Sequence, residues 1–352
     1  MAYGCTITVA AGKIPSSQSN FVWLATEDNF PTAAIDGGAT SILNGGGNLR
    51  CYTDSTKATR LPIEVVTFVT GGTPSAQVWG LSPTINVGST VYIEADTVAT
   101  TQPAVNDTYG RNAVWVDYEF VTHDFVIDST GNTTLSSSGT LQSSLTPPPF
   151  KGDSTDFGST SDAFYVEAVI ANLTTYDVTA WCRPDALGFN GGDIAIIQDA
   201  TSDSVQSSLL LDSSPDNFGM YNSPNAWLRS GVPSSSLLSS WNMLSGNNNG
   251  SNRAIYQNGA QIAASSSSVE AVRTLLRVGG RKPSNTTWLY SGKIAELNIK
   301  KVRNTADYKE SEYNNQSAPS AFWATSAWED QGGGGFQAAW AKNANKLLNW
   351  YN

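Results

Sequence analysis

Apolar and polar residues alternate in many short runs along this chain. The clearest example is RAIYQNGAQIAA, residues 253–264, where two alternating runs meet at Asn258-Gly259. This pair tolerates the positive φ angles that a type I′ turn needs at both central positions, so it strongly indicates a β-hairpin. A run led by Trp241 precedes the hairpin, and residues 275–280, LLRVGG, follow it. This order predicts consecutive antiparallel strands.

The same alternation predicts strands in both halves of the chain. They are expected at residues 5–9, 60–69, 75–85 (ended by Pro83), 90–96, 176–184, 193–199, 207–212 and 291–302. Turn-rich stretches such as residues 36–48, DGGATSILNGGGN, separate them,. A short helix is predicted only over residues 306–315. The pattern therefore predicts an all-β protein built from β-sandwiches.

Length and charge narrow the range of functions. With 352 residues, the chain is expected to form two domains, each able to bury its own core,. Its formal net charge of -10 argues against nucleic-acid binding, which needs a basic surface,. Polyanionic glycans are disfavoured for the same reason, whereas neutral glycans remain open.

The first residues and the cysteines indicate the cellular compartment in which the chain is made. Residues 1–13 do not resemble a secretory signal, and no apolar run approaches the roughly 20 residues of a membrane span,. We therefore expect synthesis in a cytoplasm and no membrane partner. Cys5, Cys51 and Cys182 are too few for a disulfide framework or a zinc site,. They are interpreted as reduced and buried, with a Cys5 to Cys51 bridge as the alternative.

The first third of the chain resembles a known but uncharacterised β-domain. The motifs that carry this resemblance are KIPSSQSNFVWLA, NLRCYTDSTKATRLPIEVVTF, AQVWGLSPTINVGSTVYIEA and YGRNAVWVDYEFV, in this order. That domain often precedes a laminin-G-like domain in bacterial and phage surface proteins. The resemblance implies a β-sandwich over residues 1–121 and supplies no catalytic residues.

The next two hundred residues resemble the laminin-G-like domain itself. A DSTGN stretch begins at Asp128, and the Trp241 run, the Asn-Gly hairpin, the VGG strand and the strand around Glu296 follow in order. This resemblance implies a concanavalin A-like jelly roll over residues 122–330. A glycine run, residues 332–335, then opens a tail over residues 331–352.

The sequence offers little for catalysis. His123 is the only histidine, so any Ser-His-Asp or Cys-His mechanism must use it, and we interpret it as an ordinary polar residue,. Jelly-roll glucanases typically carry a Glu-x-Asp-x-x-Glu strand. Glu94 and Asp96 supply its first half, but Ala99 stands in the third position. Glu296 stands alone in its strand, where the resemblance suggests a structural acid. We therefore expect no enzyme, and glycanase activity is only a third hypothesis.

Aromatic and basic residues indicate binding instead. Residues 217–231 are interpreted as a loop that brings together Tyr221, Trp227 and Arg229, and a second segment adds Arg281 and Trp288. Aromatic rings stack on the apolar faces of sugars while polar groups bind hydroxyls. These five residues are the candidate glycan or partner site, with core packing as the alternative.

Loop acids allow a second kind of ligand. Carboxylates at Asp153, Asp156, Asp199 and Asp203 could bind Ca²⁺,. Solvated surface carboxylates are the alternative, so no cofactor is assigned.

The tail carries its own hypothesis. If it is helical, one stripe holds Phe336, Trp340, Leu347 and Tyr351, which a short helix cannot bury alone,. It either docks on a neighbouring subunit or virion protein, or folds back on its own domain.

These observations and the tandem resemblance favour a structural protein of a bacteriophage virion. The chain would be a tail-fibre or adhesion component, or a capsid-decoration component, with other virion proteins, further copies of itself and host-surface glycans as partners. A bacterial surface or secreted glycan-binding module is the alternative.

Overall fold

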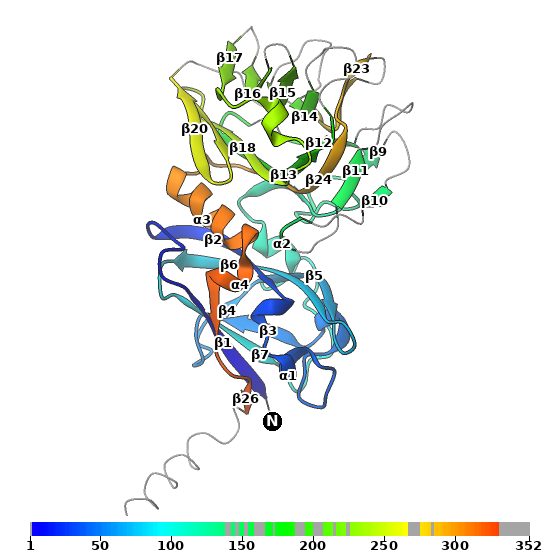
Figure 1. Ribbon diagram of the computed structural model, residues 1–352. Helices are drawn as coiled ribbons and strands as arrows, with labels where there is room; N and C mark the ends of the chain where they lie inside the picture. Colours follow the sequence, from blue (N-terminus) through cyan, green and yellow to red (C-terminus); the bar gives the residue numbers. More distant parts are fainter. Residues whose placement is uncertain are drawn as a thin grey trace, which may run out of the picture.

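The protein consists mostly of β-strands. The computed structural model describes residues 2–137, 142–144, 148–150, 154–157, 166–171, 173–186, 194–199, 207–213, 216–222, 226–266, 275–282 and 285–330. Within these residues the strands form sheets that pack in two lobes, one above the other in Figure 1. The predicted all-β sandwich class is confirmed.

The first lobe, lower in Figure 1, contains two sheets. The larger runs in the order β25 (Trp323–Thr325), β1 (Tyr3–Val9), β7 (Thr90–Ala95), β3 (Leu49–Tyr52) and β4 (Arg60–Leu61), with β26 (Glu329–Asp330) also paired to β1. The smaller contains β2 (Gln18–Thr26), β6 (Ser75–Ile85) and β5 (Ile63–Val69). Apolar side chains from both sheets form one buried core, which includes Ile7, Trp23 and Val78.

The second lobe also contains two large sheets. One has β10 (Gln142–Ser144), β11 (Ser154–Phe157), β24 (Gly292–Lys300), β13 (Tyr176–Pro184), β18 (Asn242–Asn248), β19 (Arg253–Gln257) and β20 (Ala260–Ser265), with β8 (Tyr118–Thr122) also on β24. The other has β17 (Ala226–Arg229), β16 (Asp216–Asn222), β15 (Ser207–Ser213), β14 (Ile194–Asp199), β21 (Leu275–Val278), β12 (Val166–Val169) and β9 (Leu135–Ser137). A core that includes Leu209, Phe218 and Ile255 joins them.

The predicted Asn-Gly hairpin is confirmed. Asn258 and Gly259 join β19 to β20 with φ angles of 51° and 80°. The strand predicted after Trp241 is β18, and it pairs with β19. Asn258 links the turn to this neighbour, because its backbone N–H donates to the Met243 carbonyl and its side-chain oxygen accepts from the Met243 N–H.

A third apolar cluster lies where the lobes meet. Strand β2 presents Phe21 and Trp23 to the first core, and Val22 and Leu24 to the opposite face. That opposite face packs against residues of the second lobe such as Trp181. The three-stranded sheet is therefore buried on both sides, which explains the nearly continuous apolar run FVWLA in β2,.

Helix α3 (Ala306–Ser317) bridges the two lobes (Figure 1). Its Asn315 side chain accepts a hydrogen bond from the Leu24 N–H and donates to the Leu24 carbonyl in the first lobe. On the second lobe, Lys309 is fully buried and donates to Asp177, while Gln316 accepts from Trp181. The predicted helix is confirmed, and it is an inter-lobe element.

Strand pairing departs from the predicted domain limits at two places. Strand β8, placed before residue 122 in the first domain, pairs with β24 of the second lobe. Strands β25 and β26, placed in the second domain, pair with β1 of the first lobe. The short helix α4 (Pro319–Phe322) leads the chain back, and Phe322 joins the first core. No local pattern in the sequence marks such a return, because the pairing joins residues about 320 positions apart.

Two prolines act differently from expectation. The expected strand over residues 60–69 divides at Pro62 into β4 and β5, which belong to different sheets, so the chain turns a corner there. The strand predicted over residues 75–85 is confirmed as β6, but Pro83 does not end it, since β6 continues to Ile85. Strand β5 pairs with β6 only as far as Gly80, so Pro83 lies where one side of β6 is free of β5,.

The prediction of reduced, buried cysteines is confirmed: Cys5, Cys51 and Cys182 are free thiols. Cys5 and Cys51 both lie opposite Ile93, from strands on either side of β7. Two strand spacings separate them by roughly 10 Å, beyond the Cα separation of about 7 Å that a disulfide can span. Burial raises the pKa of the Cys5 thiol to about 12.

Candidate functional site

The segment predicted as a binding loop is a β-hairpin. Residues 216–222 form β16 and residues 226–229 form β17, the last strand of its sheet (Figure 1). The loop interpretation is therefore wrong. Phe218, Met220 and Leu228 alternate into the core, which the sequence analysis did not expect for this segment. The residues between them lie on the opposite, outer face.

Three predicted residues are close in the backbone pairing of this hairpin. Tyr221 lies opposite Trp227, and Gly219 lies opposite Arg229. The Arg229 guanidinium stands 4.8 Å from the centre of the Trp227 ring, in a cation–π contact,. Trp227 is partly exposed and Arg229 is exposed. A Cβ atom at Gly219 would stand 3.5 Å from the Trp227 ring and 2.8 Å from the Leu228 carbonyl oxygen, so glycine lets the ring lie over the strand.

The other predicted residues lie elsewhere. Arg281 is in β22 (Gly280–Lys282) and Trp288 is in β23 (Asn285–Leu289), a hairpin that packs beside β14. Strands β15 and β16 separate β14 from β17, a distance of roughly 14 Å at the usual strand spacing,. The backbone positions thus form two patches. The tail residues Phe336, Trp340, Leu347 and Tyr351 lie outside the described residues.

A buried ionic cluster lies at the junction of the lobes. His123 follows β8, and its Nδ1 lies 2.5 Å from Glu296 Oε2 in β24 while its Nε2 lies 3.1 Å from Glu64 Oε2 in β5. All three side chains are at most 6% exposed. The imidazole is stacked on Trp79 at 5.7 Å between ring centres, with an angle of 21° between the planes. We call His123, Glu64 and Glu296 the junction triad.

The charge state of the junction triad follows from its surroundings. Burial alone would lower the pKa of His123, but the carboxylates of Glu296 and Glu64 raise this pKa well above its ordinary value. Burial would raise the pKa of Glu64, yet His123 and hydrogen bonds from Ser129 and Trp115 hold this pKa below its ordinary value. The triad is therefore an imidazolium between two carboxylates at neutral pH.

A β-bulge directs Glu296 to the triad. Glu296 has a φ of 50°, and the register between β13 and β24 shifts beside it. A non-glycine residue in this region costs about 1–3 kcal/mol, so surrounding contacts must hold it. Its carboxylate accepts from Gln77 as well as from His123. The structural role expected for Glu296 from its family resemblance agrees with these contacts.

The triad does not resemble a hydrolytic triad. Both ring nitrogens of His123 contact carboxylates, and the nearby Ser129 hydroxyl donates to Glu64 at 2.7 Å. A general base needs one imidazole nitrogen facing the nucleophile. This arrangement therefore holds the lobes together and leaves His123 no nitrogen for proton transfer from a serine.

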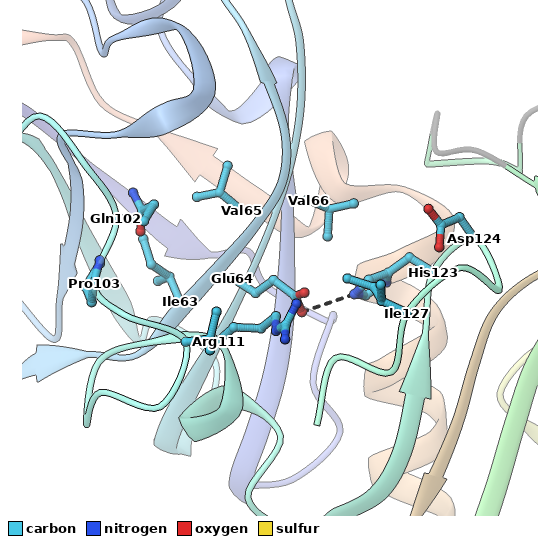
Figure 2. A pocket seen from close by; sticks show the side chains of 11 residues that line it. Ile63, Glu64, Val65, Val66, Gln102, Pro103, Arg111, His123, Asp124 and Ile127 are labelled. Atoms are coloured by element: carbon cyan, nitrogen blue, oxygen red, sulfur yellow. Dashed lines mark hydrogen bonds and ion pairs between the residues drawn. The ribbon is translucent and has the colours of Figure 1, made fainter. Parts of the chain in front are cut away.

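A pocket of about 270 Å³ opens beside the triad. Its lining comprises Ile63, Glu64, Val65, Val66, Gln102, Pro103, Val105, Arg111, His123, Asp124 and Ile127. Figure 2 shows Arg111 and Glu64 between two walls, with Gln102 and Pro103 on one side and His123 and Ile127 on the other. Most of the walls are aliphatic.

Sequence reasoning missed Glu64, Arg111 and Trp115, because they lie far apart in the chain and match no motif. The single histidine was the available signal, and it was interpreted as an ordinary polar residue. Among the described residues no group of three or more His, Cys, Asp and Glu side chains could hold a metal ion. Of the four acids suggested for Ca²⁺, Asp156 lies 3.5 Å from the Lys293 amine and Asp199 is the last residue of β14, whereas Asp153 and Asp203 lie outside the described residues.

Comparisons with known proteins leave the family open. No family model and no curated protein matches the chain. Matches among solved structures include botulinum neurotoxin type C, from work on its interaction with two ganglioside molecules, at 16% identity and a TM-score of 0.46, covering 57% of this chain and 52% of that one. The ligand binding domain of botulinum neurotoxin serotype D in complex with N-acetylneuraminic acid matches at 14% identity and 0.47, covering 59% and 53%.

A further match is the binding domain of Paraclostridial Mosquitocidal Protein 1, at 14% identity and a TM-score of 0.44, covering 56% of this chain and 51% of that one. The chain thus spans about half the length of the structures it matches. TM-scores below 0.5 at these identities carry no conclusion about what this chain binds. No helix among the described residues is long and apolar enough to cross a membrane.

Proposed function

We propose that this protein is a non-catalytic glycan-binding protein whose site is the outer face of the β16–β17 hairpin. The observation that carries the proposal is the Arg229–Trp227 pair on an edge strand, 4.8 Å apart and accessible to solvent. A sugar ring is proposed to contact the outer surface of this pair, where the guanidinium plane lies over the indole and the rim of the indole is partly exposed,. In the backbone pairing, Tyr221 is the cross-strand partner of Trp227.

A glycan array with the full-length protein tests this site. Trp227→Ala is expected to reduce glycan binding by about tenfold or more, because truncating a tryptophan at the centre of a binding site typically costs about 2 kcal/mol or more. Trp227→Phe should retain part of the binding. The matched control is Tyr109→Ala, which removes the ring under Arg60 from a similar pair, 4.6 Å apart, in the first lobe. Unchanged binding by Trp227→Ala, or equal loss in the control, would contradict the proposed site.

We further propose that the protein is a component of a bacteriophage particle, either an adhesion or a decoration protein. The support is the order of motifs in both halves of the sequence, which resembles a tandem found in phage and bacterial surface proteins. Mass spectrometry and immunogold labelling of purified particles would test this assignment. Absence from particles, together with display on a bacterial surface, would favour the alternative of a bacterial glycan-binding module.

Incorporation into the particle is proposed to use residues 331–352. A chain that ends at residue 330 should remain folded, because β26 is complete at Asp330, and should be absent from particles. Normal incorporation of this shortened chain would reject the docking role of Phe336, Trp340, Leu347 and Tyr351.

A further inference from the structure

The pocket beside the junction triad combines a mostly aliphatic wall with one uncommitted cation. The Nε atom of Arg111, at the start of α2 (Arg111–Val114), is buried and has no hydrogen-bond partner within the described part of the chain. No ion pair to its guanidinium is found among these residues either. A buried donor without a partner costs about 1–3 kcal/mol, which a ligand could recover.

Most other polar groups in the pocket already make hydrogen bonds or ion pairs with protein atoms. Glu64 accepts from His123, Trp115 and Ser129, and both nitrogens of His123 contact carboxylates. The Gln102 amide nitrogen donates to backbone carbonyls, at Leu49 among others. These groups therefore form the floor and wall and are not free to bind a ligand through the same atoms.

Charge in and near the pocket also constrains the ligand. The junction triad carries one excess negative charge, and Asp124 adds a carboxylate whose Oδ1 accepts from the Val126 N–H. These acids disfavour a polyanion, so the ligand should carry a single negative charge placed at Arg111. The exposed aliphatic residues Val105 and Ile127 extend the apolar wall to the surface.

We propose that this pocket binds a small monocarboxylate with a branched aliphatic body. The carboxylate pairs with the Arg111 guanidinium, and the aliphatic body contacts Ile63, Val65 and Ile127. The pocket volume of about 270 Å³ lies just below the range typical of pockets that bind drug-sized ligands, so the occupant is a compact molecule,. The site lies at the junction, between residues of the first lobe and those that follow β8, and is separate from the β16–β17 surface.

Three probes of nearly equal shape test the charge that the pocket prefers. The full chain is titrated by NMR or calorimetry at neutral pH with 3-methylbutanoate, 3-methylbutanamide and 3-methylbutylamine. The acid is expected to bind saturably and about tenfold or more tightly than the amide, because the amide cannot make a charged hydrogen bond to Arg111. The amine should bind weakest, because its positive charge is repelled by the guanidinium. Equal binding of acid and amide, tighter binding of the amine, or no saturable binding would overturn the proposal.

A matched pair of variants tests the residue. Arg111→Gln should weaken binding of 3-methylbutanoate by about tenfold or more, and Arg111→Lys should retain part of it. Arg183→Gln is the control, since Arg183 pairs with Asp185 in the second lobe away from the pocket. Thermal unfolding of each variant shows whether it is folded. If Arg111→Gln does not fold, the three-probe series on the unmodified chain decides whether the pocket prefers a carboxylate. Unchanged affinity in folded Arg111→Gln would reject the site.

Discussion

His123 Nδ1 lies 2.5 Å from Glu296 Oε2, so the one histidine of the chain connects the end of β8 to a bulged residue of β24. Its other nitrogen lies 3.1 Å from Glu64 in the first lobe. The junction triad thus places one cation between carboxylates from both lobes, inside a cluster of tryptophan side chains.

Replacing His123 by a neutral residue should destabilise the protein. His123→Gln leaves Glu64 and Glu296 buried as unpaired carboxylates, and we expect a loss of about 3–5 kcal/mol in the free energy of unfolding. Urea denaturation monitored by tryptophan fluorescence measures it. The control is Arg183→Gln, which breaks a partly exposed ion pair and should cost less than about 1 kcal/mol,. A similar small loss in both variants would contradict the assigned role of the triad.

Stability should depend on pH through the same residue. The folded pKa of His123 is raised above its ordinary 6.5, so its contribution is fully present below pH 6.5 and is lost as pH rises through the folded value,. The pKa of Glu64 is lowered from 4.5, so its contribution is present above pH 4.5 and is lost as pH falls,.

The free energy of unfolding should therefore be highest between about pH 4.5 and 6.5 and should fall toward alkaline pH. Denaturation curves collected from pH 4 to 9 test this profile. In His123→Gln the decline above pH 6.5 should become shallower. An equal slope in the variant would assign the alkaline loss to other groups.

The hairpin turn should tolerate no side chain at Gly259. A Cβ atom there would stand 2.9 Å from Cβ of Tyr313 and 3.0 Å from Cα of Glu310, both in α3. Gly259→Ala should therefore cost about 2–4 kcal/mol, the sum of a positive-φ cost and a clash. Gly12→Ala is the matched control, because Gly12 has a φ of 73° and open space around its Cα. Equal losses in the two variants would show that the contact with α3 is unimportant.

Lys309 should be required for the packing of α3. Its amine lies 2.8 Å from Asp177 and 2.6 Å from Glu312, and the side chain is fully buried. Lys309→Met leaves both carboxylates without a cation, and thermal denaturation should show a loss of about 3–5 kcal/mol. The exposed Lys301→Met serves as control and should change stability little. A Lys309→Met chain as stable as the control would contradict this role.

Local pattern determined much of the fold. The alternation of residues 176–184 and the Asn258-Gly259 turn predicted strand β13 and the β19–β20 hairpin, because side-chain alternation and positive φ depend on neighbouring residues,. The same local reasoning failed for residues 217–231, where a short hairpin inside a Gly- and Asn-rich segment was interpreted as a loop.

Tertiary structure alone decided which distant residues meet. Nothing near Trp323 in the sequence indicates that β25 pairs with β1, and nothing near Glu64, Arg111 or His123 indicates that they line one pocket. Their positions depend on how whole sheets pack, since contacts between residues far apart are set by burial of both faces of β2 and by the bulge at Glu296. Alternation and turn residues in the sequence by themselves determined strands such as β13 and the β19–β20 hairpin, because these depend on neighbouring residues, and the packing of the lobes determined the buried triad and the pocket beside it.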